Sequence, residues 1–134
     1  MFGLLDISTS ALVAQRTRMD IIAANLANQN SIEDANGNYD PYRRRIPVFA
    51  PGDPATGSPD GVHVQSIELD QSPLRMVYEP GNPHANAAGY VGYPNVDPTY
   101  EMVDAMEAVR AYEANISAAE ASKTMLQNAL RLLA

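Results

Sequence analysis

The last third of the chain places the strongest constraint on the fold. It opens with Asp97-Pro98, an Asp suited to cap free backbone N–H groups and a Pro at the first helical position, where its missing N–H costs nothing. No Pro or Gly follows in the rest of the sequence. A continuous helix over this segment would be roughly 55 Å long at 1.5 Å per residue. Since a small domain cannot cover such a helix, it needs a neighbour.

Apolar residues recur along this segment at alternating spacings of three and four. That 3.5-residue period is typical of a helix that lays one seam along a partner helix. The series, broken only by Lys123, consists of Met102, Ala105, Val109, Tyr112, Ile116, Ala119, Leu126, Leu130 and Leu133. Small residues from Ala111 to Ala121 lie about half a turn away. They either reflect the high helix propensity of Ala or form a second packing surface.

The N-terminal segment predicts a second, shorter helix of roughly 35 Å, capped by Asp6 or Ser8. Asn25, Asn28 and Asn30 weaken its end, and the turn signal Asn36-Gly37-Asn38 follows. Its apolar side is made of Leu5, Leu12, Met19, Ile22 and Leu26. If the two helices pair, the longer one overhangs by about 15 to 20 Å. We expect other copies or other proteins to cover the apolar side chains left over.

The middle of the chain, 39–96, holds nine of the ten prolines and six of the eight glycines, which excludes long helices. Strands are expected at 46–49, 62–69 and 74–78, with an exposed loop at 50–61 and an extended lead at 89–94. The predicted fold class is therefore mainly α with a small β-rich insert. Its long N- and C-terminal helices would pair as an α-helical coiled coil.

This interpretation divides the chain into an N-terminal helix and turn at 1–38, the insert at 39–96 and the long helix at 97–134. The first and last parts would form one discontinuous coiled-coil core, because neither helix can bury its apolar side alone. At 134 residues the chain has enough length for one modest core.

Composition excludes several classes of function. A net charge of −7 argues against nucleic-acid binding, which needs a basic face. The absence of cysteine excludes disulfides and thiolate metal sites. No apolar run is long enough for a membrane span, and the N-terminus lacks the features of a cleaved signal. If the protein leaves the cytoplasm, we expect a dedicated export route.

No pattern of an active site is present. The two histidines, His63 and His84, have no carboxylate at a recognisable ligand spacing, and no serine lies in a nucleophile-elbow pattern. No glycine-rich stretch opens a helix as a phosphate loop does. We therefore predict no catalytic residue, no cofactor and no metal.

One dense charge cluster stands out, Arg43-Arg44-Arg45. It is either a solvated strand end or an electrostatic docking patch for an acidic surface of a neighbour. Docking is favoured, because arginine is preferred at interfaces.

Five ordered motifs together resemble those of a known family. They are Ser10-Ala11-Leu12 to Ala24-Asn25-Leu26-Ala27-Asn28, Tyr42-Arg43-Arg44-Arg45 with Pro47-Val48-Phe49, Gly89-Tyr90-Val91, Tyr93-Pro94-Asn95-Val96-Asp97 with Glu101-Met102-Val103, and Arg110-Ala111-Tyr112-Glu113-Ala114-Asn115. In this order they are similar to the bacterial flagellar basal-body rod proteins. The resemblance covers nearly the whole chain.

This resemblance implies a structural subunit of the proximal part of the rod, a hollow drive shaft that transmits torque and conducts exported subunits. It implies helical assembly in the periplasm and export by the flagellar type III system. The implied partners are other copies of the chain, other rod subunits, the membrane-embedded ring with its rod adaptor, and the export apparatus.

The residues expected at subunit interfaces come from both predicted helices and from the arginine cluster. They are Leu5, Leu12, Met19, Ile22, Leu26, Arg43, Arg44, Arg45, Met102, Val109, Tyr112, Ile116, Leu126, Leu130 and Leu133. Two alternatives stay open at this point: a cell-wall-associated hydrolase, and a cytoplasmic helical-hairpin adaptor.

Overall fold

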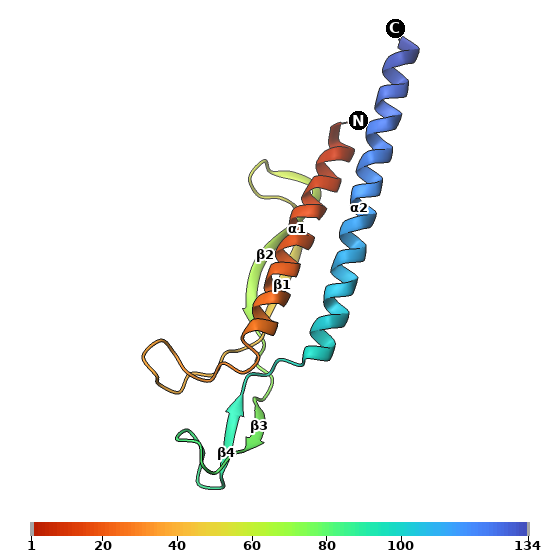
Figure 1. Cartoon of the computed structure of the whole chain (residues 1–134). Helices are drawn as coiled ribbons and strands as arrows, with labels where there is room; N and C mark the ends of the chain where they lie inside the picture. Colours follow the sequence, from red (N-terminus) through yellow and green to blue (C-terminus); the bar gives the residue numbers. More distant parts are fainter. Residues whose placement is uncertain (1, 134) are drawn as a thin grey trace.

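Two helices flank a small insert of strands in the computed structural model, which describes residues 2–133. The helices are α1 (Phe2–Ala27) and α2 (Pro98–Leu133). Between them lie β1 (Arg45–Asp53), β2 (Ser58–Leu69), β3 (Arg75–Tyr78) and β4 (Tyr90–Tyr93). The predicted class, mainly α with a small β-rich insert, is confirmed (Figure 1).

The two helices lie side by side and run in opposite directions, so both ends of the chain are at the same end of the molecule (Figure 1). Asn25 contacts Glu101, and Arg18 contacts Glu107. In each pair the two residue numbers add up to about 125, and the same sum identifies other residues that face each other across the antiparallel helices. The first residue of α1 therefore faces about residue 123 of α2. The ten or so residues beyond that point extend roughly 15 Å past α1.

The predicted start of α2 is confirmed. The Asp97 carboxylate accepts a hydrogen bond from the Thr99 N–H at 2.8 Å, as a helix cap does. The predicted start of α1 at Asp6 or Ser8 is wrong, because the helix begins at Phe2. The Thr9 and Ser10 hydroxyls donate to the carbonyls one turn earlier, which lets polar residues lie inside a helix.

The strands β1 and β2 form an antiparallel hairpin that runs from the pair Arg45–Leu69 to the pair Asp53–Ser58. The hairpin packs along α1 on the side away from α2 (Figure 1). The exposed loop expected at 50–61 is therefore wrong, since both strands continue into it and only 54–57 lie between them. Gly52 and Gly61 have positive φ angles of 84° and 91°, which let the strands bend where their register shifts.

A second antiparallel pair, β3 with β4, lies at the far end of the molecule from the chain termini (Figure 1). The predicted strand at 74–78 is thus confirmed apart from its first residue, and the extended lead at 89–94 contains β4. Val91 and Val96 are buried there. The Tyr39 hydroxyl donates to the Gly92 carbonyl at 2.9 Å, which fastens the loop after α1 to β4.

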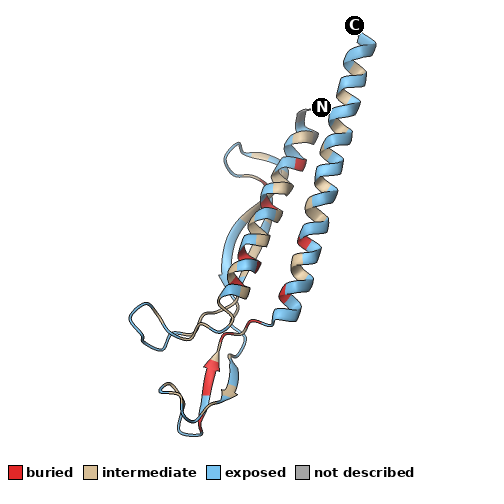
Figure 2. Cartoon of the chain, in the orientation of Figure 1, coloured by how far each residue is buried: buried red, intermediate tan, exposed pale blue. Residues whose placement is uncertain are grey.

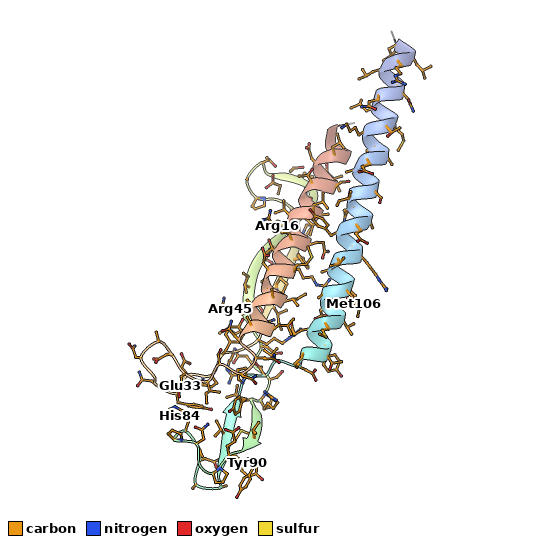
Figure 3. All side chains as sticks on the ribbon, in the orientation of Figure 1. Arg16, Glu33, Arg45, His84, Tyr90 and Met106 are labelled. Atoms are coloured by element: carbon orange, nitrogen blue, oxygen red, sulfur yellow. The ribbon has the colours of Figure 1, made fainter. Side chains whose placement is uncertain are left out.

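His84 and Glu33 make a second connection of that loop, with their side chains 2.9 Å apart (Figure 3). These contacts position the insert against the end of α1. Among the described helices and strands, α2 packs only against α1, and Figure 2 shows most of α2 exposed.

Candidate assembly interface

The α2 residues that approach α1 are small or polar. The least exposed of them are spaced three or four apart along the helix: Glu101, Ala105, Ala108, Ala111, Asn115, Ala119 and Ser122. Ala108 has no exposed surface. Small side chains at these positions let the two helix backbones approach closely, so α2 contributes mainly small and polar side chains to the contact.

Most of the apolar series predicted for α2 lies outside this contact. Met102, Val109, Ile116, Leu130 and Leu133 are exposed, from 36% at Ile116 to 85% at Leu133. Tyr112 and Leu126 are half-buried. The large residues of the series therefore lie mostly outside the face that packs against α1, whereas its small members Ala105 and Ala119 lie on that face. Two of the contact residues, Glu101 and Ala108, come one position before the series members Met102 and Val109. One position along an α-helix is a rotation of about 100°, so these contact residues lie about 100° around the helix from those members.

Further apolar side chains widen the exposed surface of α2. Tyr100, Val103, Met106, Met125 and Leu132 are exposed as well. Met106 projects away from α1 in Figure 3. Exposed apolar side chains gathered along one element in this way mark an interaction surface.

The residues predicted on α1 lie in a different environment. Ile22 is buried, and Leu5, Leu12, Met19 and Leu26 are half-buried. The reason is that α1 lies between α2 and the β1–β2 hairpin, so two elements of its own chain cover it. Less apolar surface is left on α1 than on α2 for any partner.

The arginine cluster divides into three environments. Arg44 is bound within its own chain: its Nε donates to Glu101, its Nη2 donates to Asp104 at 3.1 Å, and its Nη1 lies 3.8 Å from Asp70. Arg43 donates to the backbone carbonyls of Asp70 and Ser72.

Arg45 is exposed, with its guanidinium 5.4 Å from the centre of the Tyr42 ring (Figure 3). Arg45 is therefore the most exposed of the three arginines, since Arg43 and Arg44 are half-buried. Burial alone would lower the pKa of Arg44, but the hydrogen bond and the negative charge of Glu101 outweigh burial and raise that pKa.

Asn25 and Glu101 lie at the centre of this arrangement, and sequence reasoning missed both. Asn25 is 1% exposed, and its amide donates to Glu101 at 3.2 Å and to the Arg45 carbonyl at 3.0 Å. Its amide oxygen accepts from the Tyr42 hydroxyl and from the Arg45 N–H, each at 2.9 Å. We call Asn25, Arg44, Glu101 and Asp104 the junction cluster, because they join α1, the segment before β1, and α2.

The sequence held one signal for this cluster. Glu101 is in phase with the small residues that face α1, which is an unusual place for an acid. A buried carboxylate needs a cation, and the arginine cluster supplies one.

Neither histidine belongs to a larger group of ligands. His63 contacts the Gly52 carbonyl at 2.7 Å, and His84 contacts Glu33. Within residues 2–133, no three His, Cys, Asp or Glu side chains are placed to share a metal ion. Over the same residues, neither helix combines the length and the hydropathy that crossing a bilayer requires.

Comparison with known proteins agrees with this architecture. Residues 5–31 match the family described as flagella basal body rod protein, and residues 87–132 match the C-terminal family of the flagellar basal body rod FlgEFG proteins. These two ranges contain nearly all of α1 and α2.

Curated relatives match over almost the full length. The chain is 46% identical to the flagellar basal-body rod protein FlgC of Salmonella typhimurium and 41% identical to that of Bacillus subtilis, with 98% of this chain and 97% of each relative covered. The FlgC of Borreliella burgdorferi is 38% identical, over 99% of this chain and 97% of the relative. With such similarity from end to end, the chain belongs to the family of flagellar basal-body rod proteins.

Proposed function

We propose that this chain is a structural subunit of the proximal flagellar rod, which assembles helically with other axial proteins into a hollow shaft. The observation that carries the proposal is the exposed apolar surface along α2. Each large apolar side chain that an assembly buries there contributes roughly 1.5–3 kcal/mol. A single copy leaves that surface in contact with water.

In this assembly the two helices act as one discontinuous core, made of 1–38 and 97–134, with the insert 39–96 attached to it. The antiparallel packing of α1 and α2 supports this division. We propose that the exposed series on α2 pairs with helices of neighbouring subunits as a coiled coil. The 3.5-residue spacing of the series is the one that such packing requires.

The proposed interface has two parts. The main part lies on α2, at Met102, Val109, Tyr112, Ile116, Leu126, Leu130 and Leu133. A smaller part uses the half-buried side of α1, with Leu5, Leu12, Met19, Ile22 and Leu26, and the exposed guanidinium of Arg45. Arg43 and Arg44 support that part from inside the chain through their own contacts.

The partners would be further copies, other rod subunits, and the membrane-embedded ring with its rod adaptor at the base. The subunit would reach the periplasm through the flagellar type III export apparatus without a cleaved signal. The support is membership of a family whose curated members are named basal-body rod proteins. Those names describe structural proteins, so neither a hydrolase nor a cytoplasmic adaptor is favoured.

The test is Ile116→Asp, which places a charge in the exposed apolar series. The isolated chain should keep the wild-type circular dichroism spectrum, since Ile116 lies outside the α1 contact. Rods should fail to form and cells should lose motility, because each interface would bury an unpaired charge.

The control is Ser117→Asp, which adds the same charge at the next, exposed position. Electron microscopy of basal bodies and swimming in soft agar measure both variants. Normal basal bodies in the Ile116→Asp strain would contradict the proposal.

A further inference from the structure

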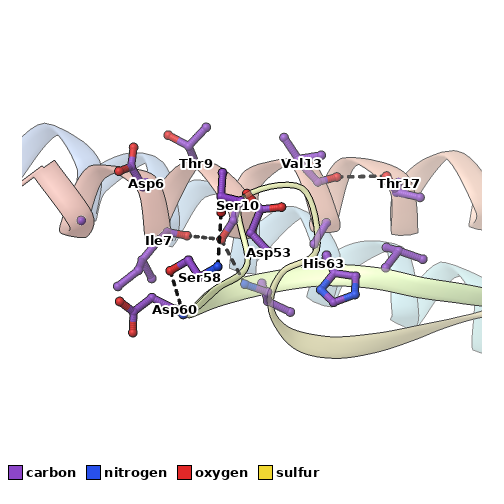
Figure 4. A pocket seen from close by; sticks show the side chains of 15 residues that line it. Asp6, Ile7, Thr9, Ser10, Val13, Thr17, Asp53, Ser58, Asp60 and His63 are labelled. Atoms are coloured by element: carbon purple, nitrogen blue, oxygen red, sulfur yellow. Dashed lines mark hydrogen bonds between the residues drawn. The ribbon is translucent and has the colours of Figure 1, made fainter.

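A cavity of about 730 Å³ lies between the N-terminal half of α1 and the tip of the β1–β2 hairpin (Figure 4). We call it the hairpin groove. Its lining residues run along α1 from Gly3 to Thr17, a length of about 21 Å. The opposite wall comes from 53–64. The Ser10 hydroxyl accepts a hydrogen bond from the Val62 N–H at 3.1 Å, which joins the hairpin to the helix within the lining of the groove.

The lining of the groove combines apolar, hydroxyl-bearing and acidic side chains. Ile7 and Val13 are exposed on α1, and Val62 and Val64 line the hairpin side. Three acids lie around them: Asp6, Asp53 and Asp60. Apart from His63, the described residues that line the groove include no basic side chain.

The pKa of Asp53 lies below its ordinary value of 3.8. Its carboxylate accepts hydrogen bonds at 2.9 Å from the Ala55 N–H and from the Thr56 hydroxyl. The Ala55 bond, followed by the Thr56 bond, lowers the pKa of Asp53. The groove therefore presents negative charge beside an apolar floor at neutral pH.

The end of α2 has the complementary character. Residues 123–133, which we call the α2 overhang, carry Lys123 and Arg131 and no acid. Met125, Leu130, Leu132 and Leu133 are exposed there, Leu132 to 88%. The α2 overhang is about 16 Å long, which fits within the 21 Å of the groove.

A chain cannot fill its own groove. Its α2 lies on the side of α1 away from the hairpin, and its α2 overhang continues past the start of α1 (Figure 1). We propose that the hairpin groove receives the α2 overhang of a second copy of this chain. This inference rests on the proposed function, since it identifies one of the contacts through which the subunit would assemble.

The geometry of such a contact suits a rod. A second copy displaced by about 20 Å along the helix axis, toward the β3–β4 end, brings its α2 overhang level with the groove. Groove and overhang are different surfaces, so the contact is head-to-tail. Every added copy then offers a fresh groove and a fresh overhang, and the result is a closed ring or a helical filament.

Disulfide crosslinking tests the contact directly, because the chain contains no cysteine. One chain carries Val13→Cys and a size tag. The other carries Met125→Cys, Leu130→Cys or Leu132→Cys, which together allow for small differences in register. We expect oxidation of the assembled mixture to give a tagged–untagged dimer with at least one of the three.

The matched control combines Val13→Cys with Tyr100→Cys, an exposed position at the opposite end of α2. This pair should give no more dimer than random collision does. Assembly without any of the three overhang disulfides would overturn this inference and leave the proposed function standing. So would a disulfide that forms only with a different rod protein. A chain that never assembles would overturn both.

Charge reversal supplies an independent measurement. Lys123→Glu with Arg131→Glu should raise the concentration needed for assembly by about tenfold, because two attractive pairs become repulsive. Adding Asp6→Lys and Asp60→Lys should restore assembly. Failure of this rescue, with all variants folded by circular dichroism, would count against the groove as the binding site.

Discussion

The guanidinium of Arg44 donates a hydrogen bond to the carboxylate of Glu101, a side chain with no exposed surface, across 57 residues of sequence. Arg44 itself remains 24% exposed. One end of this pair lies before β1 and the other in the first turn of α2. The pair therefore fixes the direction in which the long helix leaves the insert, and with it the face that α2 presents to other subunits.

Removing Arg44 should destabilise the protein strongly. Arg44→Ala leaves the Glu101 carboxylate buried without its cation, which we expect to lower the free energy of unfolding by about 3 kcal/mol. Urea denaturation followed by circular dichroism measures the change. The double variant Arg44→Ala/Glu101→Gln should recover part of the loss, because it buries no unpaired charge. Arg16→Ala, an exposed change on α1, is the control and should stay within about 0.5 kcal/mol of wild type. Equal losses in the Arg44 and Arg16 variants would show that the pair does not hold the junction.

Acid should weaken the fold through Asp70. Hydrogen bonds from the Ser72 hydroxyl and N–H, with the charges of Arg44 and Arg43, lower the pKa of Asp70 below its ordinary value of 3.8. A lowered folded-state pKa gives stability that is present above about pH 3.8 and is lost as pH falls through the folded value. Asp70→Asn should therefore be less stable at about pH 7 and lose less stability on acidification.

Unfolding midpoints measured from about pH 7 to pH 2 check this dependence. Asp20→Asn, at an exposed position on α1, is the control and should keep the wild-type profile. An acid limb that is unchanged in Asp70→Asn would contradict the assignment.

A methyl group at Gly61 should strain the contact between the hairpin and α1. Gly61 has a φ angle of 91°, and an added Cβ would lie 2.7 Å from the Ser10 Oγ. Gly61→Ala should cost about 1–3 kcal/mol of unfolding free energy. Gly57→Ala is the matched control, because Gly57 also has a positive φ, of 70°, but an added Cβ there meets no described atom within 4 Å. Thermal unfolding of the two variants gives the comparison, and equal melting temperatures would argue that the hairpin tip is not held against α1.

Local sequence signals predicted the helices and strands better than they predicted the contacts between those elements. The Asp97-Pro98 start and the absence of later Pro and Gly predicted α2, since both are local properties of the backbone. The prolines confined the strands to the middle of the chain for the same reason. The 50–61 loop was wrong because pairing between β1 and β2 is a contact between distant residues, which composition does not report.

Local patterns along the chain were enough to predict a long uninterrupted helix, a shorter partner helix, a β-rich insert and the motifs of a rod protein. The face of α2 that meets α1 depends on contacts between distant residues, which local patterns do not reveal. The periodicity of the sequence identifies large apolar residues. The contact of α2 with α1 is instead made by Glu101 and small side chains of α2, which let the two backbones come close. Only the tertiary structure paired Arg44 with that acid. A buried charge needs a partner of opposite charge close to it in space, and Arg44 and Glu101, which are far apart in sequence, meet only in the folded chain.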